Sequence, residues 1–197
     1  KISGIQQNRP TAAKTMLHHT SAKAAPLISS STTAHRASQL ASSISQTYSE
    51  YELVLVPQLH GAFIFATDLA RTIDMPSTID FLDKFLVGYD SNGTVQIIED
   101  LEVNIKDRDV LIIEDIVDTG HALTATLALL SARPPRSLEF VTLFNKESRR
   151  AIDVGPRWVG FEIDDRFVVG YGLDLDECFR NLPYITDITK LPIQYSG

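Results

Sequence analysis

The stretch VLIIEDIVDTGHALT, from Val110 to Thr124, decides the fold of this chain. Its first four residues form a short apolar run rich in β-branched side chains, which is typical of a strand buried on both faces of a parallel sheet. Two acids, Glu114 and Asp115, follow at once, where such a strand would leave the sheet. Leucines then recur at helical spacing behind a turn at residues 118–120, which predicts a helix.

The turn at residues 118–120 has the character of an anion site. In open parallel sheets, ligands bind at the carboxyl ends of the strands, and the first turn of a following helix offers backbone N–H groups and a positive dipole end. We therefore expect phosphate on Thr119 and Gly120, with the paired acids binding vicinal hydroxyls, with or without a divalent metal ion. The alternative is an ordinary strand, turn and helix in which Asp118 or Thr119 only caps the helix.

Two acids followed by Asp-Thr-Gly resemble the ribose-phosphate signature of the type I phosphoribosyltransferases. That resemblance implies an α/β fold, a twisted and mainly parallel sheet flanked by helices, with a small hood subdomain. It also implies that Glu114 and Asp115 bind the ribose hydroxyls and that the turn behind them holds the 5′-phosphate through backbone donors. Asp118 becomes the candidate general base and acid at the purine N7, which requires hydrogen-bond reach and a suitable pKa. The candidate phosphate-binding residues are Asp118, Thr119, Gly120, His121 and Ala122.

A second apolar strand, Leu53 to Val56, ends at a proline and leads into the loop Gln58-Leu59-His60-Gly61. This loop resembles the family's pyrophosphate-binding loop, where the usual residues are Leu-Lys-Gly and the peptide before the Lys is cis. Leu59, His60 and Gly61 are therefore candidate pyrophosphate-binding residues, and a cis peptide is expected between Leu59 and His60. The alternative is a plain turn made possible by Gly61.

The segment WVGFEIDDRFVVGYGLDLDECFRNLPYI, residues 158–185, narrows the resemblance to the hypoxanthine-guanine branch, where it forms a hood over the purine. The resemblance implies that the ring of Phe167 stacks on the base, a favourable contact for a flat π system, and that the backbone at Val168 reads the purine edge. It places Asp174 at the purine site and at a magnesium ion. It assigns Arg180 to pyrophosphate, since a planar guanidinium donates two parallel hydrogen bonds.

Mg²⁺ is the cofactor that the resemblance implies. This ion binds carboxylate and phosphate oxygens while keeping several of its waters. The candidate ligands are Asp174, Glu114 and Asp115.

Lys146 stands just past an expected strand from Leu138 to Phe144. The resemblance implies that a Lys there donates to the exocyclic oxygen of a 6-oxopurine, and it assigns Ile116 to the purine site as well. The alternative is a solvent-facing Lys on the charged loop KESRR. The position at the carboxyl end of a strand favours the functional interpretation.

Three positions depart from the family pattern. Ala122 stands where a Thr usually meets the 5′-phosphate, a hydrogen bond to a charged group worth roughly 1.5–3 kcal/mol, unless Thr124 or His121 substitutes. His60 replaces the loop Lys. Gly88-Tyr89 stands where the family's mobile lid carries Ser-Tyr, and the lid at residues 83–94 looks short. These changes leave open a divergent specificity, or a protein that binds nucleotide without catalysis.

Composition bounds the class of protein. With 197 residues and 44% hydrophobic content, the chain can form one domain with a full core. A net charge of −7 argues against wide nucleic-acid contact. The single cysteine, Cys178, excludes an internal disulfide and fits a reducing compartment, so a cytoplasmic location is expected. No apolar run approaches transmembrane length, so no membrane partner is expected.

The chain divides into three parts by composition. Residues 1–25 form a basic, acid-free arm that resembles an organellar transit peptide, although added residues or a loosely packed arm explain it equally well. Residues 26–190 form the expected phosphoribosyltransferase domain, with 158–188 contributing to the hood, and 191–197 form a tail. A helix capped around Ser31 to Thr33 is expected to cover the core, with His35 and Arg36 on its surface. Its predicted inward face is Ala34, Ala37, Leu40, Ala41, Ile44 and Tyr48.

The sequence is therefore interpreted as a purine salvage phosphoribosyltransferase. The expected reaction joins hypoxanthine, and also guanine, through N9 to phosphoribosyl pyrophosphate, giving IMP or GMP and pyrophosphate. A homodimer or homotetramer is implied by the resemblance alone. The alternatives are a xanthine-preferring enzyme, a nucleotide-sensing regulatory protein of the same fold, and a general nucleotide-binding α/β domain.

Overall fold

A computed structural model describes residues 25–48, 52–87 and 94–191. The basic arm before residue 25, the tail after residue 191 and the Gly88-Tyr89 pair lie outside the described residues. Among the helices that are described, none combines the length and the apolarity needed to cross a membrane.

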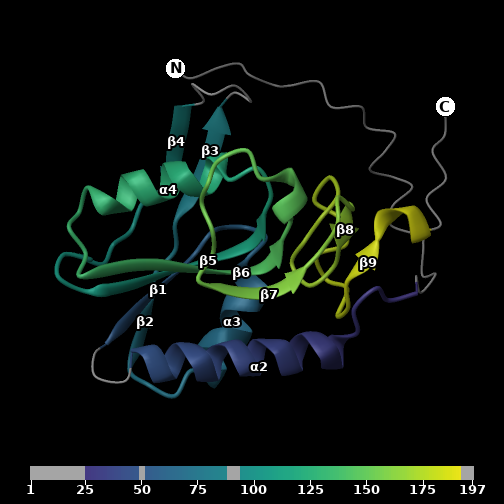
Figure 1. Cartoon of the computed structure of the whole chain (residues 1–197), viewed down its shortest axis with the longest axis horizontal. Helices are drawn as coiled ribbons and strands as arrows, with labels where there is room; N and C mark the ends of the chain where they lie inside the picture. The colour runs from purple at the N-terminus through teal and green to yellow at the C-terminus, as the bar shows by residue number, and fades with distance from the viewer. Residues whose placement is uncertain (1–24, 49–51, 88–93, 192–197) are drawn as a thin grey trace, which may run out of the picture.

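Five parallel strands form the main sheet, in the spatial order β2-β1-β5-β6-β7 (Figure 1). The predicted Val110 run lies in the central strand, β5, so the expected mainly parallel sheet is confirmed. The strand bounds are β1 Leu53–Pro57, β2 Ser77–Ile79, β5 Asp109–Val117, β6 Ser137–Asn145 and β7 Trp158–Glu162.

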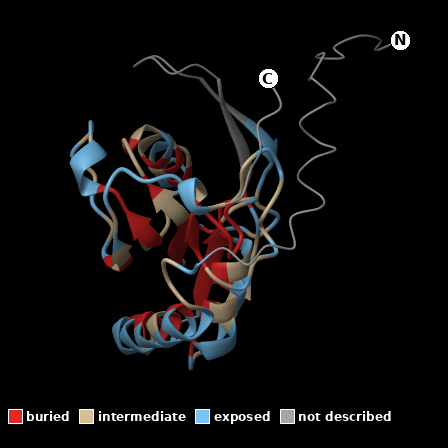
Figure 2. Ribbon diagram, turned by 90° about the vertical axis from the view of Figure 1, so that its right-hand side faces the viewer, coloured by how far each residue is buried: buried red, intermediate tan, exposed pale blue. Residues whose placement is uncertain are grey.

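Helices cover both faces of this sheet (Figure 1), and the buried residues, red in Figure 2, form two hydrophobic clusters. Helices α2 (Ser30–Thr47) and α3 (Phe63–Thr72) lie on one face, and α4 (His121–Ser131) lies on the other. Side chains alternate along each strand, so β1 sends Leu53 and Leu55 to the α2–α3 side and Val54 and Val56 to the α4 side. Burial on both faces explains why these strands read as continuous apolar runs.

Helix α2 begins slightly earlier than predicted. Its N-cap is Ser29, whose side chain accepts a hydrogen bond from the Thr32 N–H. The predicted face is confirmed except at Ala34, which is exposed, while Thr33 is buried instead. The helix therefore turns a face through residues 33, 37, 40, 44 and 48 toward the core, one step back from Ala34.

Arg36 is not a simple surface residue, so that prediction was wrong. Its guanidinium donates to the carbonyl oxygens of Gly160 and Val159 in β7, at 2.7 Å each. These bonds join α2 to the edge strand across more than 120 residues of sequence. His35 is exposed, as predicted.

Two antiparallel hairpins stand apart from the main sheet. One is β3 (Asp83–Val87) with β4 (Thr94–Glu99). The other is β8 (Val168–Val169) with β9 (Thr186–Asp187), within the expected hood. Strand β8 ends at Val169, because Gly170 and Gly172 take φ values of +97° and +101° and turn the chain. Short 3-10 helices, η2 (Glu147–Arg149) and η3 (Ile188–Lys190), complete the described elements.

Candidate active site

The paired acids lie where β5 loses one of its two neighbours. Pairing with β1 ends at Ile113, whereas pairing with β6 continues to Val117. Glu114 and Asp115 are therefore inside the strand rather than just beyond it, which corrects the expected strand end. The strand continues because β6 still supplies hydrogen-bond partners. Beyond Ile113 the β1 side of β5 has no strand partner, and we call this place the notch. Glu114 is 8% exposed in this position.

The loop after β1 fills that notch. A Cβ atom on Gly61 would lie only 1.6 Å from Oδ2 of Asp115, so this backbone packs directly against the acid. On its other side, a Cβ on Gly172 would lie 2.3 Å from the carbonyl oxygen of Gly61. The loop thus sits between β5 and the hood, and only glycine fits at either contact. The Leu59–His60 peptide is cis, as expected.

Asp115 connects the two sequence stretches that carried the resemblance. Burial raises the pKa of its carboxyl group, and the negative charge of Asp174 adds to that rise. The N–H of Ile116, 2.7 Å from Oδ1, and the positive charge of Arg180 act in the opposite direction. Asp115, Asp174 and Arg180 therefore share one electrostatic environment, although they are about 60 residues apart in the chain.

The guanidinium of Arg180 is fixed by its own loop. Nη1 donates to the carbonyl oxygen of Gly172 at 2.8 Å, and Nη2 lies 3.0 Å from Asp174 and 3.1 Å from Glu177. Asp174 is held in turn by the N–H of Glu177 at 2.8 Å. The guanidinium is thus held in one orientation by groups of its own loop, with both Nη atoms already paired.

The turn at residues 118–120 leads into α4 without a side-chain cap. Gly120 has φ +92°, and no side chain makes a cap hydrogen bond there. Asp118 pairs instead with Arg149, at 2.8 Å, so the helix-capping alternative for Asp118 is wrong. The carbonyl oxygen of Thr119 accepts from two N–H groups of the loop at residues 151–152, which holds the turn in place. The start of α4 thus presents its N–H groups to the carboxyl edge of the sheet.

Two side chains were considered as substitutes for the missing hydroxyl at Ala122. The Thr124 hydroxyl donates to the carbonyl oxygen of Gly120 at 2.9 Å, so its proton is already used within the helix. The His121 ring lies over the turn, with Nδ1 3.1 Å from the Thr119 hydroxyl. Of the two, His121 is the side chain placed at the turn itself.

Lys146 is buried rather than solvent-facing, at 8% exposure, so the surface alternative for this residue is wrong. Its Nζ lies 3.9 Å from Asp165, a residue of the hood segment, and Arg149 reaches the same acid at 3.0 Å. Phe167 follows two residues later and is 51% exposed. Val168 is buried and pairs with Asp187, so the hairpin holds the backbone while the Phe167 ring remains accessible.

The donor set suits magnesium only if substrate oxygens complete the coordination. Within residues 25–48, 52–87 and 94–191, no three His, Cys, Asp or Glu side chains gather closely enough to hold a metal ion by themselves. Mg²⁺ is usually bound through one or two carboxylates plus phosphate oxygens and waters, rather than by an all-protein cage. The carboxylates of Asp174 and Asp115 offer that chemistry beside Arg180.

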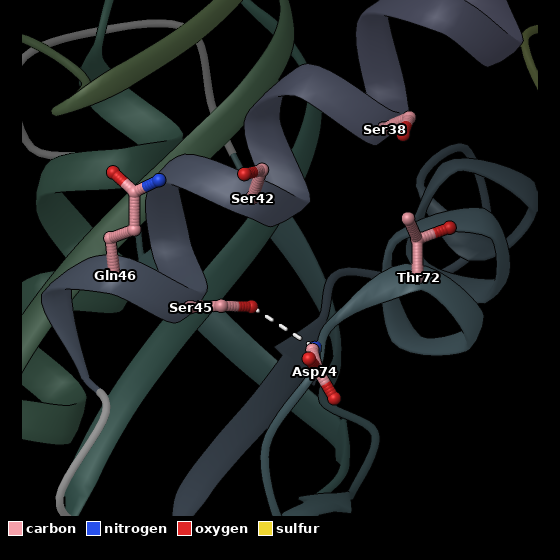
Figure 3. Close-up of a pocket in the computed structure, with 6 residues that line it drawn as sticks. All are labelled: Ser38, Ser42, Ser45, Gln46, Thr72 and Asp74. Atoms are coloured by element: carbon pink, nitrogen blue, oxygen red, sulfur yellow. Dashed lines mark hydrogen bonds between the residues drawn. The ribbon is translucent and has the colours of Figure 1, made fainter.

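A groove elsewhere on the molecule does not belong to this site. Figure 3 shows it between α2 and the carboxyl end of α3, where the Ser45 hydroxyl accepts the Asp74 N–H at 3.1 Å. Because α3 runs back from the carboxyl end of β1, the groove lies toward the opposite end of the sheet. Its lining is Ser38, Ser42, Ser45, Gln46, Thr72 and Asp74, without a cationic side chain to bind phosphate.

Sequence reasoning missed two residues near the site. Arg149, which pairs with Asp118, was counted only as part of a charged loop. Gln58, at the carboxyl end of β1, is 5% exposed and was not singled out. A glutamine continuing an apolar strand was the available signal for the second residue, whereas nothing in the sequence distinguished Arg149 from Arg150.

Comparison with known proteins defines the class. Residues 30–176 match the family model described as "Phosphoribosyl transferase domain". A hypoxanthine-guanine phosphoribosyltransferase of Staphylococcus aureus is 45% identical over 161 residues, which cover 81% of this chain and 89% of that protein. A hypoxanthine phosphoribosyltransferase of Salmonella typhimurium is 40% identical, covering 79% of this chain and 90% of that protein.

Solved structures agree with these relatives. The crystal structure of a hypoxanthine-guanine phosphoribosyltransferase from Bacillus anthracis has a TM-score of 0.80 and 37% identity, covering 83% of this chain and 95% of that one. The Trypanosoma cruzi hypoxanthine phosphoribosyltransferase in complex with the product IMP has a TM-score of 0.79 and 31% identity, covering 82% and 92%. The chain therefore belongs to the phosphoribosyl transferase family and, within it, to the hypoxanthine-guanine phosphoribosyltransferases, which are purine salvage enzymes. The comparisons favour neither the xanthine-preferring nor the regulatory alternative.

Proposed function

We propose that this enzyme transfers the phosphoribosyl group of phosphoribosyl pyrophosphate to N9 of hypoxanthine and guanine, giving IMP or GMP and pyrophosphate. The observation that carries the proposal is the packing of Gly61 between Asp115 and Gly172, because Gly172 holds the Arg180 guanidinium that pairs with Asp174. It brings together acids that can bind a sugar and the Arg180 guanidinium, which can bind a pyrophosphate. The glycine turn at the start of α4 follows β5. The printed names of the relatives support the choice of base.

The ribose 5-phosphate half of the substrate is assigned to β5 and the turn behind it. Carboxylates only accept hydrogen bonds, so Glu114 and Asp115 suit two vicinal hydroxyls, which donate. The 5′-phosphate is assigned to residues 118–122, where helix N–H groups and the positive dipole end of α4 favour an anion. The buried Glu114 and the half-buried Asp115 thus lie together at the edge of the sheet to which the sugar is assigned.

The purine half is assigned to Lys146, Phe167 and the hood backbone. The buried Lys146 ammonium donates to the exocyclic oxygen of a 6-oxopurine, and the accessible Phe167 ring stacks on the base. The Val168 backbone reads the purine edge, and Ile116 contributes its half-buried side chain from β5. Asp118 moves a proton at N7, acting as general base or acid according to the direction of reaction.

The departing pyrophosphate is assigned to Arg180 and to the cis loop at residues 59–61. Positive charge develops on the ribose as the bond to pyrophosphate breaks, so stabilisation is needed on both separating halves. The paired acids face the ribose, and the Arg180 guanidinium faces the leaving group. A bound Mg²⁺, held by Asp174 with Glu114 or Asp115, supplies charge neutralisation for the pyrophosphate oxygens.

The remaining parts of the proposal concern assembly and location. We expect a homodimer or homotetramer, with residues 26–190 as the catalytic domain and 158–188 contributing the hood. A cytoplasmic location is consistent with a single cysteine, Cys178. Size-exclusion chromatography with light scattering measures the assembly directly.

Product formation tests the proposed reaction. The purified protein is incubated with phosphoribosyl pyrophosphate, Mg²⁺ and one base at a time, and nucleotide is separated by liquid chromatography. IMP and GMP should form readily and XMP poorly, and chelation of Mg²⁺ by EDTA should stop the reaction. A preference for xanthine would overturn the base assignment, and the absence of any nucleotide would overturn the reaction.

A further inference from the structure

Gln58 is a buried polar residue whose side chain the fold leaves without a partner. It is 5% exposed, and neither its amide nitrogen nor its amide oxygen has a hydrogen-bond partner within the described part of the chain. A buried donor or acceptor that forms no hydrogen bond costs free energy, and native proteins rarely keep one without a functional reason. The position itself does not require a polar group, since Val54 and Val56 occupy the same row of β1.

The register of the sheet places Gln58 beside Glu114. Val54 pairs with Val110 and Val56 pairs with Ile112, and all four lie on the α4 side of the sheet. The Gln58 N–H donates to the Ile113 carbonyl oxygen at 3.0 Å, so the ladder continues one step further. Side chains alternate, and the next pair on that same side is therefore Gln58 and Glu114.

The backbone of Gln58 is held from both sides. Besides its bond to β5, Gln58 forms a bridge with Leu82, and Leu82 exchanges backbone hydrogen bonds with Pro57 and Leu59 at 3.3 and 3.2 Å. The backbone that carries the Gln58 side chain is thus fixed beside β5, just before the cis Leu59–His60 peptide. A group fixed in this way can bind a ligand without first being ordered.

We propose that Gln58 binds substrate, donating its side-chain N–H to the ribose hydroxyl whose own proton Glu114 accepts. This inference rests on the proposed function and deepens it. A hydroxyl is both donor and acceptor, whereas the carboxylate of Glu114 can only accept. Glu114 therefore takes the hydroxyl proton but gives the hydroxyl oxygen no donor. The neighbouring amide N–H supplies the missing donor.

Two substitutions separate a binding role from a structural one. Gln58→Leu removes both polar atoms and leaves an apolar side chain of similar size, one bond shorter, while Gln58→Glu keeps the shape and replaces the donor by an acceptor beside Glu114. We expect Gln58→Leu to raise the KM for phosphoribosyl pyrophosphate about three- to tenfold. The KM for hypoxanthine should change less than twofold and the unfolding temperature should not fall. Gln58→Glu should raise the first KM further, because two carboxylates would then face one hydroxyl.

Gln46→Leu is the matched control, because Gln46 is exposed on α2 at the groove of Figure 3 and should leave every parameter unchanged. An unchanged KM for phosphoribosyl pyrophosphate in Gln58→Leu, or a rise confined to hypoxanthine, would overturn the proposal. A lower unfolding temperature without a KM change would show that Gln58 is structural.

Direct binding keeps this test independent of catalysis. Ribose 5-phosphate is titrated into the wild-type protein and Gln58→Leu by calorimetry, with no base present. Weaker binding by Gln58→Leu supports the inference even if the wild-type protein forms no nucleotide, which would overturn only the proposed reaction. Equal binding by the two proteins overturns the inference, even if nucleotide forms normally.

Discussion

Strand β5 carries one aspartate, Asp109, at its start and another, Asp115, near its end, and the pKa values of the two carboxyl groups shift in opposite directions. At the start, the Arg136 guanidinium, with Nε 3.0 Å from Asp109, lowers the pKa of that carboxyl, and the Ser137 hydroxyl at 2.7 Å contributes. Near the end, burial raises the pKa of Asp115. The charged form of an aspartate is therefore stabilised at one end of β5 and disfavoured at the other.

The difference separates structure from function within one element. At the amino edge, the protein supplies the cation and the hydroxyl that its buried acid needs. At the carboxyl edge, burial disfavours the charged form of Asp115, and the side chain of Gln58 has no hydrogen-bond partner within the described residues. Electrostatic strain of this kind at a site is expected where ligand binding relieves it.

The largest expected effect concerns the turn behind the acids. Asp118→Asn should lower turnover by about 10²- to 10⁴-fold, the usual contribution of a general base or acid, with little change in KM for phosphoribosyl pyrophosphate. Steady-state kinetics at saturating hypoxanthine measures both parameters. Asp107→Asn, in the turn at the amino edge, is the matched control and should stay near wild type. Unchanged turnover in Asp118→Asn would remove Asp118 from the mechanism.

A gain of function sharpens the same comparison. Ala122→Thr restores a hydroxyl at the first turn of α4, where the 5′-phosphate is proposed to bind. Affinity for phosphoribosyl pyrophosphate should rise about tenfold, the low end for a hydrogen bond to a charged group. Calorimetric titration measures this change. Equal affinity in the two proteins would argue that the phosphate does not lie on this turn.

The amino edge should respond through stability and not through activity. Asp109→Asn should destabilise the fold by about 1–2 kcal/mol at pH 7, because solvent access to Arg136 keeps the ion pair near the low end for charged hydrogen bonds. The folded pKa of Asp109 is lowered, so this stabilisation is present above the unfolded value of about 4 and is lost as pH falls through the folded value. Urea unfolding of both proteins should show their difference shrinking below about pH 4.

The smallest expected effect has the opposite sign. Asp115→Asn should leave the ligand-free protein as stable as wild type at pH 7, or stabilise it by up to about 1 kcal/mol. A raised folded pKa means that the charged carboxylate is disfavoured, so its cost is present above the folded value and absent below the unfolded one. Urea unfolding without substrate measures this, and a clear loss of stability would contradict the account.

Local patterns in the sequence predict the central part of the fold. The apolar run of β5, the leucine spacing of α4 and the strands β1 and β6 follow from side-chain patterns, and these are confirmed. The carboxyl ends of parallel strands meet at one edge, which is why acids and turns distant in sequence could be expected to gather. The cis Leu59–His60 peptide was predictable from family resemblance, and not from the residues themselves.

Contacts over long sequence separations were beyond that reasoning. Arg36 was expected at the surface, yet it binds carbonyl groups of β7, which only the packed structure brings within reach. The pairing of Arg149 with Asp118 and the burial of Gln58 depend on the same three-dimensional placement. Thr33 is buried where Ala34 was expected, because packing against the sheet, and not hydrophobicity alone, sets which face of the helix points inward.

One kinetic comparison tests the central claim most directly. The kcat/KM for phosphoribosyl pyrophosphate is measured in Asp115→Asn and Asp109→Asn, under conditions where both proteins are folded. We expect a fall of at least about 100-fold for Asp115→Asn, since one acidic contact to the reacting sugar is lost, and a change of less than about twofold for Asp109→Asn. Equal effects in the two variants would contradict the division of β5 into a structural end and a catalytic end.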